Sequence, residues 1–432
     1  MSPPRPWSDL LPELLSQVLA QLRKHPVDVA RFRVVCRAWH SAARQVQVQQ
    51  QQPPWIVLPN AFSTIGGDDD IFLHRIPRLR PDDEAKDVDV TCVGASGCWL
   101  ALDYIYLQRR GDVKHKHRYL LHNPFSGNTV PLPELDAIIG DDFPEKFKIR
   151  KVLMCSGSLE GHDRLVAITT NNKRYPIIVC RPGKGRWVLP NLDVFEVAFF
   201  GGGKQLLYGI TPNEDLIAFD LTETKRNNGD GSGRRIVCKF KRVIRHPLAD
   251  GEHDPRSWMD DIDDYYVLYD DEDYEDDENG EVPDGVDLME DEEVPYCPKD
   301  LIITTRRLIV SCSGQELLMV RDHQVQSLRY KSAYTCKLEI FRADLNASRW
   351  VPVTDDDSSV PAQGEALFLS RSSSKAIHAY GDIKKGIYSL DTSQLFDTSS
   401  RAREPFSIPG ESGRPTPDDK CFTWVFPPKL VV

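Results

Sequence analysis

The chain has 432 residues, 40% of them hydrophobic and 28% charged, with a formal net charge of −11 at pH 7. This length allows one small module followed by one large domain of repeats, or two to three separate domains. No apolar run approaches the roughly 18 residues that cross a bilayer and no secretory signal opens the chain, so we expect a soluble protein of the cytoplasm, the nucleus or both, without a membrane partner.

Residues 7–43 are expected to form short amphipathic helices. Pro12 and Glu13 mark a helix start, since proline fits the first turn and an acid there matches the helix dipole. Helical spacing then gives one apolar stripe of Leu14, Leu15, Val18, Leu19 and Leu22. Pro26 is expected to end this helix, and Asp28 to cap a second segment with the stripe Phe32, Val35, Cys36, Trp39, Ala42 and Ala43.

Leu10 and Leu11 precede the first helix and lie outside both stripes. A unit of about 40 residues is too small to fold robustly alone, so two leucines ahead of a proline are predicted to be buried by another protein. The alternative is a helical hairpin whose stripes face the rest of this chain, which leaves the leading leucines unexplained.

Two runs, 10–15 with its leucine-proline start and 31–39 with its Cys-Arg-x-Trp end, together resemble an F-box. The resemblance implies a three-helix module over residues 1–44 that binds a Skp-type adaptor and, through it, a cullin ubiquitin ligase. By position it implies adaptor contact, or support of that contact, by Leu10, Leu11, Pro12, Leu15, Leu19, Val35 and Trp39.

Residues 45–54 are rich in glutamine and end in two prolines, which is typical of a linker. After them the chain is a series of short β-type runs separated by turn residues. Trp187 and Trp350 open strands and are expected to pack between repeated units. The clearest strand–turn–strand units lie at 119–133, 177–190 and 338–353.

A repeated unit of about 40 to 50 residues is typical of a β-propeller, whose blades bury their faces only against neighbours. Residues 55–432 leave room for about six or seven blades. The segment 421–426 is predicted to close the ring beside a strand at 55–58. A meander sandwich is the alternative for this strand density. The expected fold is therefore mainly β, with a small all-α N-terminal module.

Most of the negative charge lies in one segment. Residues 257–298 contain 19 Asp or Glu and no Lys or Arg, and without them the chain has 54 basic against 46 acidic residues, a balance of +8. Because so many side chains of the same charge repel one another, we expect a disordered insert that protrudes from the propeller. Alternatively, its interleaved tyrosines allow it to lie over a basic propeller face or to bind a basic partner. The body of the chain lacks an interleaved basic and aromatic motif, which argues against a nucleic-acid partner.

No catalytic, cofactor or metal site is predicted. The run GGGK at 201–204 lacks the spacing and the Ser or Thr of a phosphate loop, and is expected to be a glycine turn. His115 and His117 alternate as two strand ligands of a metal would, but the basic residues around them favour a solvated loop. The ten cysteines contain no C-x-x-C pair and are expected to be small core residues.

Beyond the F-box, the runs 123–133, 186–190, 338–353, 366–370 and 424–428 resemble, in their order, the large plant family of F-box proteins with a KIB-type β-propeller. Gln363-Gly364-Glu365 departs from the Leu-Gly-Asp that members commonly carry there. The resemblance implies the substrate-recognition subunit of a Skp–cullin–F-box (SCF) ubiquitin ligase, whose propeller binds an unknown target protein. The alternatives are a non-degradative F-box scaffold and, more remotely, a propeller enzyme with acids and arginines at the channel mouth.

Overall fold

The computed structural model describes residues 7, 10–22, 32, 35–47, 54–58, 61–64, 74–75, 88–106, 116–139, 148–155, 164–201, 206–225, 234–246, 265–267, 301–327, 332–353, 364–379, 383–397, 402–406 and 423–426. Within these residues there is no helix with the length and apolarity of a membrane span.

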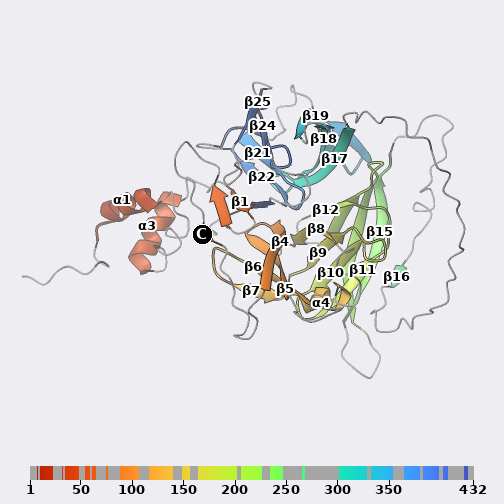
Figure 1. Cartoon of the computed structure of the whole chain (residues 1–432), viewed down its shortest axis with the longest axis horizontal. Helices are drawn as coiled ribbons and strands as arrows, with labels where there is room; N and C mark the ends of the chain where they lie inside the picture. Colours follow the sequence, from red (N-terminus) through yellow and green to blue (C-terminus); the bar gives the residue numbers. More distant parts are fainter. Residues whose placement is uncertain are drawn as a thin grey trace, which may run out of the picture.

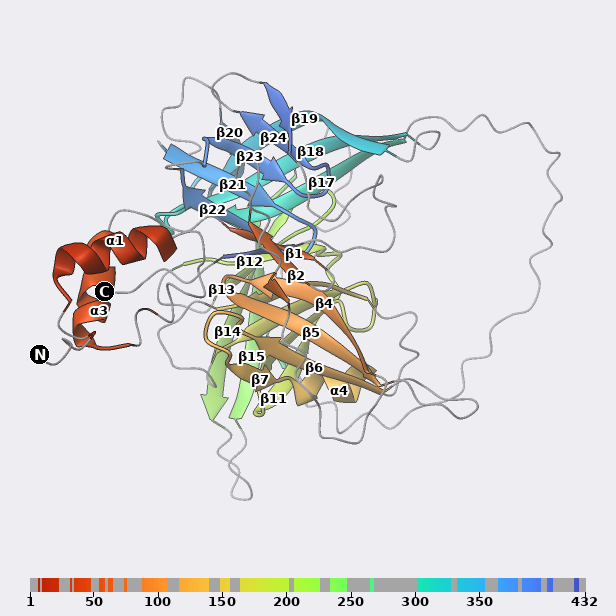
Figure 2. The ribbon, with the colours of Figure 1, turned by 60° about the vertical axis from the view of Figure 1, so that its left-hand side comes forward.

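The strands lie in sheets around a common centre, with the N-terminal helices to one side (Figures 1 and 2). The first sheet contains, in order, β26 (Thr423–Val425), β1 (Trp55–Leu58), β2 (Ala61–Thr64) and β3 (His74–Arg75). The second contains β4 (Val88–Ser96), β5 (Trp99–Tyr106), β6 (Lys116–His122) and β7 (Thr129–Pro131). The third contains β8 (Ile149–Met154), β9 (Val166–Thr170), β10 (Ile177–Arg181) and β11 (Gly185–Leu189).

The remaining strands form three further sheets. The fourth sheet contains β12 (Glu196–Phe199), β13 (Leu206–Ile210), β14 (Leu216–Lys225), β15 (Arg234–Ile244) and β16 (Tyr265–Val267). The fifth contains β17 (Leu301–Val310), β18 (Leu317–Ser327), β19 (Ser332–Asp344) and β20 (Arg349–Pro352). The sixth contains, in order, β22 (Ser374–His378), β21 (Glu365–Leu369), β23 (Gly386–Ser389), β24 (Gln394–Asp397) and β25 (Arg403–Pro405). The sequence predicts about six or seven such units, and the described strands form six sheets.

The three predicted strand–turn–strand units are confirmed as antiparallel pairs within the sheets. Val130 lies opposite Leu121, Trp187 opposite Val179, and Trp350 opposite Ala343. Strand order follows chain order in the second to fifth sheets, and the neighbouring strands of these sheets are antiparallel. The sixth sheet differs, since β21 pairs in parallel with β23.

The core lies between successive sheets and not at one centre. Each sheet shares an apolar cluster with the next, from the first and second sheets round to the sixth and first. Trp187 is in the cluster between the third and fourth sheets, and Trp350 packs against the one between the fourth and fifth. Both predicted packing roles are therefore confirmed, and the ring of shared clusters excludes a two-layer sandwich.

The predicted closure of the ring is also confirmed. In the antiparallel pair of β1 and β26, Trp55 lies opposite Val425 and Ile56 opposite Trp424. The Trp424 side chain is fully buried, and its indole N–H donates a 2.8 Å hydrogen bond to the Leu369 carbonyl in the sixth sheet. A strand from the C-terminal end of the chain thus completes a sheet that begins at residue 55.

Two sequence predictions are wrong in part. Within the acidic segment, residues 265–267 form β16, which pairs with the outer edge of β15, so this part is an edge strand and not a disordered tail. The rest of that segment lies outside the described residues. His117 lies in β6 and its Nδ1 is 2.9 Å from an Asp103 carboxylate oxygen, so it is part of a sheet and not of a solvated loop. His115 is not among the described residues.

Three helices are described. The helix α1 (Pro12–Leu22) begins at the predicted proline, and α3 (Arg37–Gln47) covers part of the second predicted segment. The predicted cap at Asp28 and the stop at Pro26 lie outside the described residues, as does most of the 45–54 linker. The short helix α4 (Pro133–Ile139) follows β7 and packs in the cluster between the second and third sheets.

Candidate functional site

The helices α1 and α3 share a small apolar core of their own. Leu15 and Leu19 of α1 are 1% exposed, and they pack with Phe32 and Ala42. The Phe32 and Trp39 rings lie 4.5 Å apart between centroids. Leu10, Val18, Leu22 and Trp39 are partly buried against this cluster. These side chains hold the helices together and leave other apolar groups facing outward.

The start of α1 places two leucines on its outer face. The Leu11 carbonyl accepts hydrogen bonds of 3.0 Å from the N–H groups of both Leu14 and Leu15. Leu11 and Leu14 are three residues apart, so they share one face of the helix, while Leu15 points to the core. The Trp39 indole N–H donates a 3.0 Å hydrogen bond to the Trp7 carbonyl, which joins the segment before α1 to α3.

Residues 7–47, which we call the helical module, contain the exposed large hydrophobic side chains of the described residues. The large hydrophobic residues exposed among the described residues are Trp7 at 74%, Leu11 at 59%, Val35 at 54% and Leu14 at 42%. All four belong to the helical module and none to the sheets. Full burial of such side chains contributes about 1.5–3 kcal/mol each. Contact with an apolar surface of another molecule would therefore bury these side chains and stabilise the complex.

The residues predicted to serve adaptor binding divide into two groups. Leu11, Pro12 and Val35 are exposed, whereas Leu15 and Leu19 lie in the core of the module, where they position the exposed residues. Leu10 and Trp39 are partly buried. Contact with an adaptor stays a prediction for all seven.

Two exposed residues were missed by the sequence reasoning. Leu14 was assigned to the same stripe as Leu15, although its spacing of three from Leu11 indicates a second, outer face. Trp7 precedes the helices and belongs to no periodic pattern, so only the structure identifies it.

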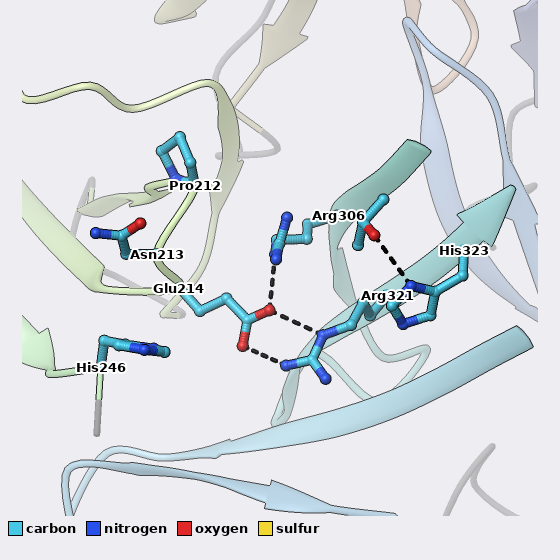
Figure 3. A pocket seen from close by; sticks show the side chains of 8 residues that line it. Pro212, Asn213, Glu214, His246, Arg306, Arg321 and His323 are labelled. Atoms are coloured by element: carbon cyan, nitrogen blue, oxygen red, sulfur yellow. Dashed lines mark hydrogen bonds and ion pairs between the residues drawn. The ribbon is translucent and has the colours of Figure 1, made fainter. Parts of the chain in front are cut away.

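A second candidate site lies between the fourth and fifth sheets (Figure 3). It is an open pocket of about 340 Å³, lined by Pro212, Asn213, Glu214, His246, Thr304, Arg306, Arg321 and His323. The turn between β13 and β14 supplies Glu214, and β17 and β18 supply the arginines. Glu214 points between the two arginine side chains.

Glu214 is the centre of an ion-pair network. Its carboxylate accepts hydrogen bonds from Arg306 Nε at 2.7 Å and Arg321 Nε at 2.8 Å, and from Arg321 Nη2. Burial alone raises the pKa of Glu214, but the hydrogen bonds from the two arginines outweigh it and lower that pKa. The carboxylate is therefore charged at neutral pH, and both of its oxygens already accept hydrogen bonds.

The register of β18 and β19 extends the network to a second carboxylate. Arg321 lies opposite Glu339 and His323 opposite Lys337. Glu339 accepts hydrogen bonds from Lys337 at 2.8 Å, Arg321 at 3.0 Å and His323 at 3.2 Å. The Lys337 hydrogen bond is the main cause that lowers the pKa of Glu339 to about 2. Catalytic carboxylate pairs need pKa values pushed apart, and here both are lowered.

The inner strands hold a buried pair of opposite charges. Lys151 of β8 donates a hydrogen bond to Glu196 of β12, and each side chain is 3% exposed. Glu196 also accepts a 3.4 Å hydrogen bond from the Leu308 N–H of β17. This pair joins three successive sheets, which is the geometry of a structural contact.

These features define a class of protein: a β-propeller with an N-terminal helical module that exposes apolar side chains. The family model for the KIB1-4 beta-propeller matches residues 68–407, and the chain belongs to this family. Residues 1–67, which include the helical module, lie outside that match.

Two curated relatives are similar to part of the chain, and both are from Arabidopsis thaliana. A putative F-box protein is 27% identical over 142 residues, which are 31% of this chain and 33% of the relative. A second F-box protein is 28% identical over 140 residues, 29% of this chain and 32% of the relative. The chain thus spans about a third of the length of each relative. No solved structure matches the chain.

Proposed function

We propose that the chain is the substrate-recognition subunit of an SCF-type ubiquitin ligase. In this role the helical module binds a Skp-type adaptor, which connects it to a cullin, and the propeller binds a target protein. The observation that carries the proposal is the confinement of exposed large apolar residues to the helical module among the described residues. The similarity of part of the chain to F-box proteins supports the same role.

A receptor of this kind needs no catalytic group. It raises the rate of ubiquitin transfer by holding the target near the charged conjugating enzyme, so proximity replaces side-chain chemistry. Glu214 in the pocket and Glu339 beside it fit this view, because each carboxylate is held by cations and not poised for proton transfer. The same role places the protein in the cytoplasm, the nucleus or both.

The test uses the full chain with Leu11→Asp. An aspartate just before a helix suits the helix dipole, so the module should stay folded while its outer face becomes charged. Wild type should co-purify with a Skp-type adaptor and a cullin, and the variant should lose both. Glu13→Ala, which alters an exposed charge of the same turn, should behave as wild type. Retention of adaptor by Leu11→Asp contradicts the proposal.

Turnover of captured proteins separates degradation from sequestration. Proteins that bind both wild type and Leu11→Asp through the propeller are candidate targets. Their half-lives should lengthen in cells that carry only the variant. Unchanged half-lives with intact adaptor binding by wild type would favour the non-degradative scaffold.

A further inference from the structure

Three side chains with metal-binding chemistry meet where the fifth sheet borders the sixth. Cys312 lies in the turn between β17 and β18, Glu365 is the first residue of β21 and His378 is the last of β22. The pairing of β21 with β22 sets Glu365 directly opposite His378. One ligand atom from each of the three residues lies within 4.8 Å of the others.

The carboxyl group of Glu365 is buried, and only one of its two oxygens has a hydrogen-bond partner among the described residues. Glu365 is 1% exposed, and its Oε1 accepts a 3.0 Å hydrogen bond from the Cys312 N–H. Its Oε2 is buried and has no hydrogen-bond partner among the described residues. An unpaired polar oxygen in the interior costs on the order of 1–3 kcal/mol, so such a group calls for a partner. A cation beside Oε2 would supply one.

The three donors are those that zinc uses. Thiolate sulfur, imidazole nitrogen and carboxylate oxygen bind Zn²⁺ at about 2.0–2.3 Å, so atoms around one tetrahedral ion lie within about 4 Å of one another. His378 is exposed, and rotation of its ring can shorten the remaining distance. With three protein ligands, water takes the fourth position.

We propose that Cys312, Glu365 and His378 form a zinc-binding site that joins the β17–β18 turn to the sixth sheet. The site is independent of the helical module and of the proposed ligase function. One ion there connects two sheets at their border and pairs with a buried carboxylate. If Zn²⁺ binds the folded chain and not the unfolded chain, it raises the free energy of unfolding, and the gain grows with the logarithm of the Zn²⁺ concentration above the dissociation constant.

Metal titration of the full-length chain, without an affinity tag that binds metals, tests the site. After removal of metal by a chelator, wild type should bind one Zn²⁺ per chain, and Co²⁺ should give thiolate-to-cobalt absorption. Cys312→Ser should lose that absorption, and His378→Ala should weaken Zn²⁺ binding more than about tenfold. The controls Cys155→Ser, half-buried just after β8, and His40→Ala, exposed on α3, should bind as wild type.

Glu365→Gln separates a ligand from a simple hydrogen-bond acceptor. Glutamine keeps an oxygen for the Cys312 N–H and nearly the same shape, so a purely structural role should survive. The proposal predicts that Zn²⁺ raises the unfolding temperature of wild type and not of Glu365→Gln. Equal Zn²⁺ stabilisation of both proteins, stoichiometric binding that Cys312→Ser leaves unchanged, or no Zn²⁺ binding by wild type would overturn it.

Discussion

Glu214 adopts a backbone conformation that few side chains other than glycine favour. Its φ is +68°, in a turn where its N–H donates a 2.9 Å hydrogen bond to the Thr211 carbonyl. The Trp350 indole N–H donates a 2.8 Å hydrogen bond to the Glu214 carbonyl. Such a conformation costs on the order of 1–3 kcal/mol and persists only where surrounding contacts fix it. Here the contacts come from two different sheets.

Glu214→Gln should lower the free energy of unfolding by about 1–3 kcal/mol at neutral pH, because the hydrogen bonds from two arginines lose their ionic component. The pKa of Glu214 is lowered in the folded chain from its usual 4.5. Its contribution is therefore complete above that value and is lost as pH falls through the lowered pKa. Denaturant unfolding of both proteins from about pH 7 to about pH 3 should show the difference shrink.

The matched control is Glu404→Gln, which removes the charge of an exposed pair with Lys384. Exposed ion pairs contribute little, so this variant should unfold close to wild type across the same pH range. A difference between wild type and Glu214→Gln that stays constant with pH would contradict the ionic account of the pocket.

The network around Glu214 was beyond reach from the sequence. Its arginine partners lie 92 and 107 positions away, on two strands of another sheet. No local pattern marks Glu214, since turn composition predicts a turn but not which carboxylate faces the next sheet. The same limit applies to Cys312 and Glu365, which are 53 positions apart.

At the scale of elements, the three-residue strand β26 is important for the packing between sheets. It supplies Trp424 and Val425 to two different inter-sheet clusters, one on each side of the first sheet. The Trp424 ring meets Phe368 edge-on, with centroids 5.0 Å apart. This short strand therefore packs the first sheet against both the sixth and the second sheets.

Trp424→Ala should therefore destabilise the chain by about 3–5 kcal/mol, because it leaves a cavity. It also removes one of the two hydrogen bonds that the Leu369 carbonyl accepts, from the Trp424 indole N–H and the Leu390 N–H. Trp7→Ala is the matched control, since Trp7 is 74% exposed and its backbone carbonyl still accepts the hydrogen bond from Trp39. Denaturant unfolding should give nearly the wild-type value for Trp7→Ala. Similar losses for the two variants would argue against closure through β26.

The inner strands offer a second test at this scale. Glu196→Gln should cost about 3–5 kcal/mol in the free energy of unfolding, because Lys151 would be left buried without its ionic partner. The double variant Lys151→Met with Glu196→Leu should recover most of that loss, since a well-packed apolar pair avoids the desolvation cost. A double variant no more stable than the single one would show that the pair is not an isolated unit.

The strand pattern was largely predictable because hairpins depend on local signals. Alternating apolar residues and turns such as that before Trp187 identify antiparallel pairs over about ten residues. The edge strand β16 was missed because a segment so rich in acids has the composition of a disordered one, and its backbone pairing with β15 is not encoded in its own apolar pattern. His117 was misjudged because its partner Asp103 lies on another strand.

At the scale of the whole molecule, the apolar surface and the propeller are separate. Figures 1 and 2 place α1 and α3 beside the ring of sheets, and their shared core contains no residue of the sheets. Changes on the outer face of the helical module should therefore leave the propeller intact. This separation fits the proposed function, in which one end of the molecule binds an adaptor and the other holds a target.

Titration of a purified Skp-type adaptor onto the full-length chain tests the central claim most directly. The triple variant Leu11→Ala, Leu14→Ala and Val35→Ala should bind at least about a hundredfold more weakly than wild type, since each truncation removes about 1 kcal/mol or more of buried apolar contact. The control Glu13→Ala with Gln17→Ala changes exposed residues of the same helix. It should bind as wild type, with unchanged unfolding of all proteins. An adaptor dissociation constant equal in wild type and triple variant would contradict the account.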